Sequence, residues 1–272
     1  MPFAQTNHGT LHYDVVDQVA PWRGRKEAIL FHHGIGASAA IWAGWWPSLV
    51  DAYRVVSFDM RGYGRSHIPP ADAKWSLQLL IDDVFAIADA ADLQRFHLVG
   101  ESIGGTVALA AAARRPDRIA TLTVSNGAHL GASIQGVKAW REQLERGPKV
   151  WSDKFMQDRF HRGALSSERW DWFAHQQEKW PAHSILNALG VLVGTDLTPE
   201  LAGICCPTLL LHPDASPFIP VPVMAELHRL LPHSRLNVLA HSRHGLPYSH
   251  DRDCAAVLRA FLDETAGVQD DR

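Results

Sequence analysis

A segment in the first half of the chain changes from strand-like to helix-like residues across a single serine. It reads LVGESIGGTVALAAAARRPDRI, from Leu98 to Ile119, and Ser102 lies where an apolar run gives way to an alanine-rich one. The apolar residues before the serine are typical of a buried strand, and the alanines after it favour a helix. A chain that turns so sharply needs residues without bulk beside the turn, and Gly100 and Gly104 meet that need. The segment therefore predicts a strand, a tight turn at Ser102 and a helix.

Similar strand-like runs alternate with helical patterns over most of the chain. Three apolar runs bounded by turn residues predict buried strands, at Glu27 to His33, Arg54 to Asp59 and Arg95 to Gly100. Between the last two, the segment from Trp75 to Leu93 places apolar residues three and four apart, which predicts an amphipathic helix. The alternation resumes at Pro207 to His212. It predicts an α/β fold with a mostly parallel sheet and helices on both faces.

One region breaks this alternation. Between residues 131 and 195 no convincing strand-like run occurs, and five of the ten tryptophans lie there among charged residues: Trp140, Trp151, Trp170, Trp172 and Trp180. We interpret 131–195 as a helical cap. The core of the fold would then consist of residues 1–130 and 196–272.

Composition restricts the compartment and the partners. The 272 residues, 46% of them hydrophobic, can bury one sizeable core. A net charge of -3 and a pI near 6.6 leave no basic excess for a nucleic acid or an anionic membrane, so we expect neither as a partner. Three cysteines, two of them adjacent, are typical of a reducing compartment rather than of a disulfide framework. With no leader-like or membrane-spanning apolar run, we expect a cytoplasmic protein.

Ser102 is a candidate nucleophile. It lies in the pattern G-x-S-x-G between a predicted strand and a predicted helix, the context that holds a serine hydroxyl out on a strained turn. The start of the helix also points backbone N–H groups at the site, so the N–H of Ile103 could bind an oxyanion. The alternative is a structural serine in a glycine-rich turn. As a nucleophile, Ser102 would need a histidine base that is itself oriented by an acid.

Five motifs spread over the chain resemble those of the α/β-hydrolase fold superfamily. They are HHGIG (His32 to Gly36), FDMRGYGRS (Phe58 to Ser66), GESIGG (Gly100 to Gly105), PDRI (Pro116 to Ile119) and RHGLPYSH (Arg243 to His250). The segment VSNGAHLG is similar to one in enol-lactone hydrolases, and HGLPYSH is similar to one in macrocyclic-lactone hydrolases. The resemblance implies the chain order serine, acid, histidine, with the base on the loop after the last strand.

That loop offers three candidates for the base. They are His241, His244 and His250. His244 fits best, because a glycine and an apolar residue follow it shortly before the terminal helix. His241 stays an alternative, although it lies close to the end of the strand, whereas His250 would open the helix.

The acid departs from the pattern that the resemblance implies. The family usually places an aspartate in the loop after the strand TLLLH, and the register puts Ser216 at that position. The nearest carboxylate is Asp214, two residues earlier, and we predict it as the acid because loops absorb such shifts. A solvated loop aspartate is the alternative. Some relatives take the acid from the end of the strand before the cap, where this chain has Asn126, an amide that cannot stabilise an imidazolium as a carboxylate does.

The remaining site residues surround Ser102. The resemblance implies a second oxyanion-binding N–H at Ile35, with Gly34 beside it shaping the loop and contacting the substrate. We expect the cap aromatics to line an apolar pocket, with Trp140 and Trp172 touching the substrate while the others pack the cap on the core. Glu101, next to Ser102, is expected to enter a structural hydrogen-bond network.

Together these residues predict a serine hydrolase that cleaves carboxylic esters or lactones of a moderately apolar small molecule. Ser102 would attack the carbonyl, His244 would transfer the proton, Asp214 would stabilise the imidazolium, and the N–H groups of Ile35 and Ile103 would bind the oxyanion. This chemistry needs no cofactor or metal. Two alternatives stay open: perhydrolysis, C–C hydrolysis or lyase chemistry on the same triad, and a ligand-binding homologue with weak turnover.

Overall fold

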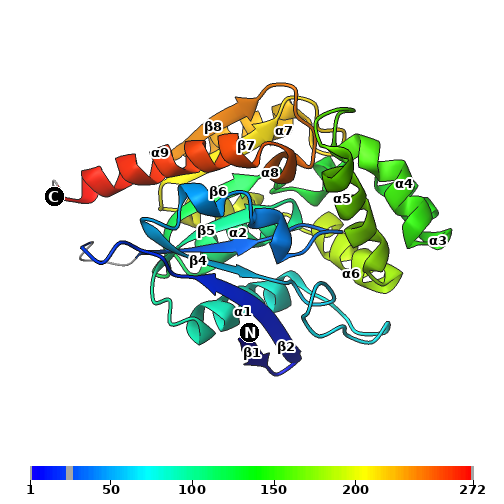
Figure 1. Cartoon of the computed structure of the whole chain (residues 1–272), viewed down its shortest axis with the longest axis horizontal. Coiled ribbons are helices and arrows are strands. Elements are labelled where there is room, and N and C mark those ends of the chain that lie inside the picture. Colours follow the sequence, from blue (N-terminus) through cyan, green and yellow to red (C-terminus); the bar gives the residue numbers. More distant parts are fainter. Residues whose placement is uncertain (1, 23–26, 271–272) are drawn as a thin grey trace.

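The computed structural model describes residues 2–22 and 27–270, and within these ranges eight strands form one sheet (Figure 1). The strands are β1 (Phe3–Thr6), β2 (Gly9–Val16), β3 (Glu27–His32), β4 (Tyr53–Phe58), β5 (Phe96–Glu101), β6 (Ile119–Ser125), β7 (Thr208–Pro213) and β8 (Ser234–Leu239). Their spatial order is β1-β2-β4-β3-β5-β6-β7-β8, and β3 to β8 run parallel. The predicted α/β fold with a mostly parallel sheet is confirmed. An N-terminal hairpin of β1 and β2, which pairs antiparallel with β4, was missed by the sequence pattern.

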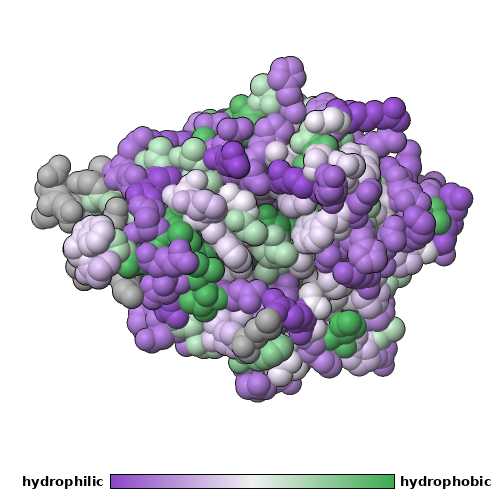
Figure 2. All heavy atoms as spheres, viewed as in Figure 1, coloured by the Kyte–Doolittle hydropathy of each residue, from purple (hydrophilic) through white to green (hydrophobic). Residues whose placement is uncertain are grey.

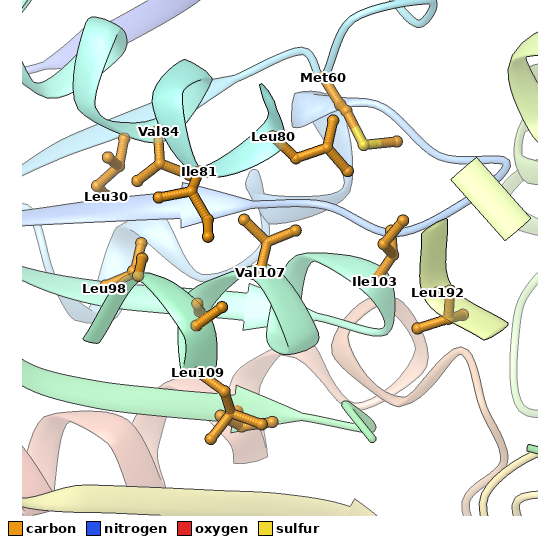
Figure 3. Packing of buried hydrophobic residues seen from close by; sticks show 14 of the residues in the cluster. Leu30, Met60, Leu80, Ile81, Val84, Leu98, Ile103, Val107, Leu109 and Leu192 are labelled. Carbon is orange, nitrogen blue, oxygen red and sulfur yellow. The ribbon is translucent and has the colours of Figure 1, made fainter. Parts of the chain in front are cut away.

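Helices cover both faces of this sheet. They are α1 (Leu77–Ala90), α2 (Ile103–Arg114), α7 (Val221–Leu230), α8 (Leu246–Ser249) and α9 (Asp251–Asp270). On β3, Leu30 packs with the residues of α1 and α2, whereas Ile29 and Phe31 pack with those of α9 on the other face. Figure 3 shows Leu30 and Leu98 beside Val84 and Val107 in the first of these layers. Burial on both faces is why the central strands read as continuous apolar runs.

The segment predicted as a cap, 131–195, holds four α-helices, which follow a short 3-10 helix (Gly131–Ser133). They are α3 (Val137–Glu145), α4 (Pro148–Arg159), α5 (Ser167–Lys179) and α6 (Ala182–Val193), which lie together at one end of the sheet (Figure 1). Backbone hydrogen bonds close the base of this segment. Gly131 N–H donates to Thr195 O at 2.7 Å, and Leu197 N–H donates to His129 O at 2.8 Å. The cap helices thus leave and rejoin the core at nearly one point, between β6 and β7.

The surface agrees with the composition. Figure 2 shows hydrophilic residues over most of one face, with smaller apolar groups between them. Among the described residues, no helix is both long enough and apolar enough to cross a lipid bilayer.

Candidate active site

Ser102 occupies a strained turn between β5 and α2. Its backbone has φ 55° and ψ -120°, outside the regions that serine usually adopts. The strand and the helix meet so closely that a Cβ on Gly100 would lie 2.2 Å from the carbonyl oxygen of Gly104. A Cβ on Gly104 would lie 2.4 Å from the carbonyl oxygen of His32. The two glycines are therefore required, and the turn has the geometry predicted from the sequence.

His244 meets Ser102 from the far end of the chain. It lies on the loop between β8 and α8, it is 2% exposed, and its Nε2 atom is 3.2 Å from Ser102 Oγ. The other two candidates for the base point elsewhere. His241 has φ 56° and uses its backbone N–H to bind Asp214, and the ring of His250 contacts Ser249 Oγ. The structure thus pairs the serine and the histidine that the sequence analysis preferred.

Two backbone N–H groups beside Ser102 point away from local acceptors. Ile103 is the first residue of α2, so its N–H has no acceptor within the helix. The Gly34–Ile35 peptide is fixed through the Gly34 carbonyl oxygen, which accepts from His33 Nδ1 at 2.8 Å and from Ala37 N–H at 3.3 Å. The Ile35 N–H therefore points the opposite way. These are the two donors predicted for an oxyanion hole, and no acceptor within the described ranges is paired with either of them.

Gly34 brings this loop close to Ser102. A Cβ on Gly34 would lie 2.8 Å from Ser102 Cβ and 2.0 Å from a carboxylate oxygen of Glu101. Any other residue here would push the loop away from the serine. The predicted shaping role of Gly34 fits this approach, although Gly34 is absent from the residues that line the cavity described next.

A small, mostly apolar cavity of about 20 Å³ opens on Ser102 and His244. Its other walls are Ile134, Gln135, Val137, Trp140, Leu189, Leu192, Phe218 and Ile219. Of the two tryptophans predicted to touch the substrate, Trp140 lines this cavity and Trp172 does not. The ring of Trp172 stacks on Tyr248 at 5.4 Å and is half-buried away from the cavity. Phe218, which the sequence analysis missed, packs edge-on against His244 with a centroid distance of 4.9 Å.

Comparisons with known proteins agree with this fold. The model of the alpha/beta hydrolase fold family matches residues 27–170, which is more than half of the chain. The chain belongs to the alpha/beta hydrolase fold family. "Putative carbamate hydrolase RutD" of Variovorax paradoxus is 31% identical over 95% of this chain and 97% of its own length, and its namesake in Caulobacter vibrioides is 28% identical over 93% and 95%. The solved structure of an enol-lactonase from Burkholderia xenovorans LB400 matches with a TM-score of 0.85 at 22% identity, over 96% of this chain and all of that one.

In this member of the alpha/beta hydrolase fold family, Asp214 is not the partner of the histidine. The carboxylate of Asp214 accepts the N–H groups of His241 and Ser242, at 2.9 and 3.0 Å, and it is exposed. The prediction was wrong because the backbone N–H of Asp214 donates to Leu239 O, which holds Asp214 against the turn after β8. Asp214 therefore shapes that turn and does not reach the imidazole.

Ser216 lies where the acid was expected by register. Its Oγ is 3.3 Å from His244 Nδ1 and also accepts the N–H of Ile219 at 3.2 Å. Asn126 does not replace the acid, because its Nδ2 donates to the backbone carbonyl of His244 at 2.9 Å. Among the described residues, no carboxylate contacts the imidazole. The hydroxyl of Ser216 can accept a hydrogen bond from the Nδ1–H group and so orient the ring, but it adds no negative charge.

The charges around His244 favour a neutral imidazole. Burial lowers the pKa of His244 well below its usual value, and the positive charge of Arg159 lowers it further. A neutral imidazole can accept a proton from Ser102. The imidazolium that results has no carboxylate partner, so this chain stabilises it less than a complete triad would.

Glu101 lies under the Gly34 loop, as its predicted structural role requires. Burial raises the pKa of this carboxyl to about 7, although Arg159 and the backbone N–H of Gly34 oppose the shift. His32 and His33 have structural roles too: each donates its Nδ1 proton to a backbone carbonyl at 2.8 Å, and burial lowers the pKa of both. No group of three or more potential metal ligands occurs in the part of the chain that the structure describes.

The serine at the position expected for the acid gives a first prediction. Ser216→Asp places a carboxylate beside His244 Nδ1, so the pKa of the imidazole should rise and ester turnover should increase at least about tenfold, because the imidazolium gains a partner. Steady-state kinetics over a pH series would measure both effects.

Asp214→Asn is the matched control for this prediction. It should cost far less than the roughly 10⁴-fold loss that follows removal of a triad carboxylate. A loss of that size in Asp214→Asn, with no gain in Ser216→Asp, would return the role of the acid to Asp214.

The raised pKa of Glu101 gives a second prediction. Between the usual pKa of 4.5 and the folded-state pKa of about 7, the folded protein binds more protons than the unfolded chain. As the pH rises through this window, Glu101 therefore lowers the free energy of unfolding by about 1.4 kcal/mol for each pH unit. Glu101→Gln should remove this slope. Urea unfolding of the variant and the wild type at several pH values would measure it.

The control for Glu101 is Glu142→Gln, at an exposed position on α3. Its unfolding curve should follow the wild type at every pH. If the difference between Glu101→Gln and the wild type were constant from pH 4.5 to pH 7, the carboxyl would not titrate as described.

Proposed function

We propose that this chain is a serine hydrolase that cleaves carboxylic ester or lactone bonds of a moderately apolar small molecule, through an acyl-enzyme on Ser102. The observation that carries the proposal is the 3.2 Å approach of His244 Nε2 to a serine held on a strained strand-to-helix turn. A serine at this turn can be activated only by a base within hydrogen-bond reach. The N–H groups of Ile35 and Ile103 support the proposal, since a tetrahedral oxyanion needs two such donors.

The reaction proceeds in two halves. Ser102 Oγ attacks the substrate carbonyl while its proton moves to His244 Nε2, and the negative oxygen is held by the two N–H groups. Collapse of this intermediate expels the alcohol oxygen, which takes the proton from His244, and leaves the acyl group on Ser102. Water then attacks the acyl-enzyme and gives one proton to His244. When the second intermediate collapses, the acid is released and His244 passes that proton to Ser102 Oγ. Every group in these steps belongs to the chain, the substrate or water.

The cavity supports a small apolar acyl group. Its volume of about 20 Å³ is little more than a single water molecule needs, and Gln135 is the polar side chain in its wall besides Ser102 and His244. Large aromatic and aliphatic side chains close the rest. We therefore expect short acyl chains to react faster than long ones. We also expect a cytoplasmic location, because Cys205, Cys206 and Cys254 are free thiols.

A carbamate is the second candidate substrate. The curated relatives at 28% and 31% identity carry the name of a carbamate hydrolase. A carbamate carbonyl passes through the same tetrahedral intermediate, so the same serine, base and N–H donors would serve. A carbamate is less electrophilic than an ester and would rely more heavily on the oxyanion donors.

A fluorophosphonate probe tests the proposal. The wild type should be labelled at Ser102, as peptide mass spectrometry would show, and both Ser102→Ala and His244→Ala should lose labelling. Ester turnover in these variants should fall by at least about 10⁴-fold. His241→Ala is the matched control, because it removes a nearby histidine of the same loop that does not contact Ser102, and it should be labelled like the wild type.

A panel of p-nitrophenyl acetate, butyrate and laurate, with a lactone and an aryl carbamate, would then rank the substrates. The proposal predicts fastest turnover on the short esters or the lactone. Labelling that survives in Ser102→Ala, or a wild type that neither labels nor turns over any of these compounds, would contradict it.

A further inference from the structure

A buried arginine from the cap lies beside the loop that carries Ile35. Arg159, the last residue of α4, is 2% exposed, and its Nη2 atom donates to the carbonyl oxygen of Ile35 at 2.8 Å. Three aromatic rings surround the guanidinium at 5.7–5.8 Å from their centroids, those of Trp140, Trp151 and Phe173. A charged side chain in such an apolar shell is costly to bury, and a hydrophobic residue of similar volume often packs there equally well. The hydrogen bond to Ile35 is what a hydrophobic residue could not supply.

The same turn of α4 also holds the loop of the base. The carbonyl oxygen of Arg159 accepts the N–H of Gly245, the residue after His244, at 2.8 Å. Phe160 packs so closely on this loop that a Cβ on Gly245 would lie 2.1 Å from its ring. Arg243 donates to the carbonyl oxygen of Gln157 in the same turn. The end of α4 is therefore fastened to both loops that surround Ser102.

The loop from Gly34 to Gly36 lies between a buried carboxyl group and a buried guanidinium. Glu101 packs against Gly34, and Arg159 holds Ile35, where a Cβ on Gly36 would come within 3.3 Å of Nη2. Each charge acts on the other: Arg159 opposes the rise in the pKa of Glu101, and Glu101 opposes the fall in the pKa of Arg159. The loop is thus held from the core by one group and from the cap by the other.

We propose that Arg159 is a positioning residue for the oxyanion hole. Its guanidinium holds the carbonyl oxygen of Ile35, and this keeps the backbone N–H of the same residue directed toward Ser102. The inference rests on the proposed function. Arg159 is not among the residues that line the cavity, and the ring of Trp140 belongs both to its aromatic shell and to the cavity wall. Arg159 thus acts through the loop rather than on the substrate. It follows that the cap completes the oxyanion hole as well as covering the cavity.

Substitution of Arg159 separates this role from general packing. Arg159→Met keeps the volume and removes the donor, and Arg159→Lys keeps a charge and a single donor group. Lys149→Met, at an exposed position on the same helix, is the control. For each protein, kcat and KM for p-nitrophenyl butyrate are measured with the affinities for two ligands. One is an alkyl trifluoromethyl ketone, which forms a hemiketal oxyanion on Ser102, and the other is an uncharged amide of the same chain length.

The inference predicts a specific pattern. Arg159→Met should lower kcat by roughly 10- to 100-fold, less than the loss of an oxyanion donor outright, and weaken the trifluoromethyl ketone in parallel. KM and amide binding should change little, Arg159→Lys should fall between Arg159→Met and the wild type, and Lys149→Met should match the wild type.

Two outcomes would overturn the inference. One is an Arg159→Met variant with the kcat and ketone affinity of Lys149→Met. The other is an equal loss of amide and ketone affinity, which would place Arg159 in direct contact with the substrate. If Arg159→Met does not fold, Arg159→Lys decides by the same comparison. A wild type that reacts with neither ketone nor ester would overturn the proposed function itself, and the inference with it.

Discussion

The close contact of β5 and α2 at Ser102 is the constraint on which the rest of the site depends. The strand and the helix approach until no Cβ fits on Gly100, Gly104 packs with equal closeness on the end of β3, and the serine between the two glycines has φ 55°. The forced backbone holds the hydroxyl at the carboxyl end of the sheet, and it also brings the first N–H of α2 beside that hydroxyl. The burial of both helix faces and both sheet faces supplies the packing energy that keeps this strained turn in place.

The electrostatics around the turn differ from those of a complete triad. Ser216 offers His244 a hydroxyl, Asp214 is bound to the turn after β8, and the charge with the largest effect on the pKa of the imidazole is the positive one of Arg159. The ring is therefore kept neutral, ready to accept a proton but poorly supported once it has done so. In the proposed reaction, stabilisation of the transition state would therefore rest more heavily on the oxyanion donors, and so on Glu101 and Arg159, which hold the loop of Gly34 and Ile35.

The sequence predicted the fold and the Ser102–His244 pair because each rests on local patterns. The glycine spacing needed for the turn and the alternation of strand and helix are visible in a single chain. The sequence did not predict the partner of His244. A shift of two positions along the loop after β7 decides whether a side chain points at the imidazole or at a neighbouring backbone. The roles of the cap tryptophans could be distinguished only from their packing. Trp140 and Trp172 have similar surroundings in the sequence, yet Trp140 lines the cavity and Trp172 stacks on Tyr248. Nothing in the sequence distinguished Arg159 from the surface arginines, since its burial comes from contacts with distant segments.

The central claim is that Ser102 forms a tetrahedral adduct whose oxygen is held by two backbone N–H groups while His244 works without a carboxylate. A crystal structure of the wild type with a trifluoromethyl ketone bound would test it most directly. We expect a covalent bond to Ser102 Oγ, the hemiketal oxygen within hydrogen-bond distance of the N–H groups of Ile35 and Ile103, and Ser216 Oγ still in contact with His244 Nδ1. An adduct on another residue, an oxygen turned away from both N–H groups, or a carboxylate moved onto the imidazole would contradict it.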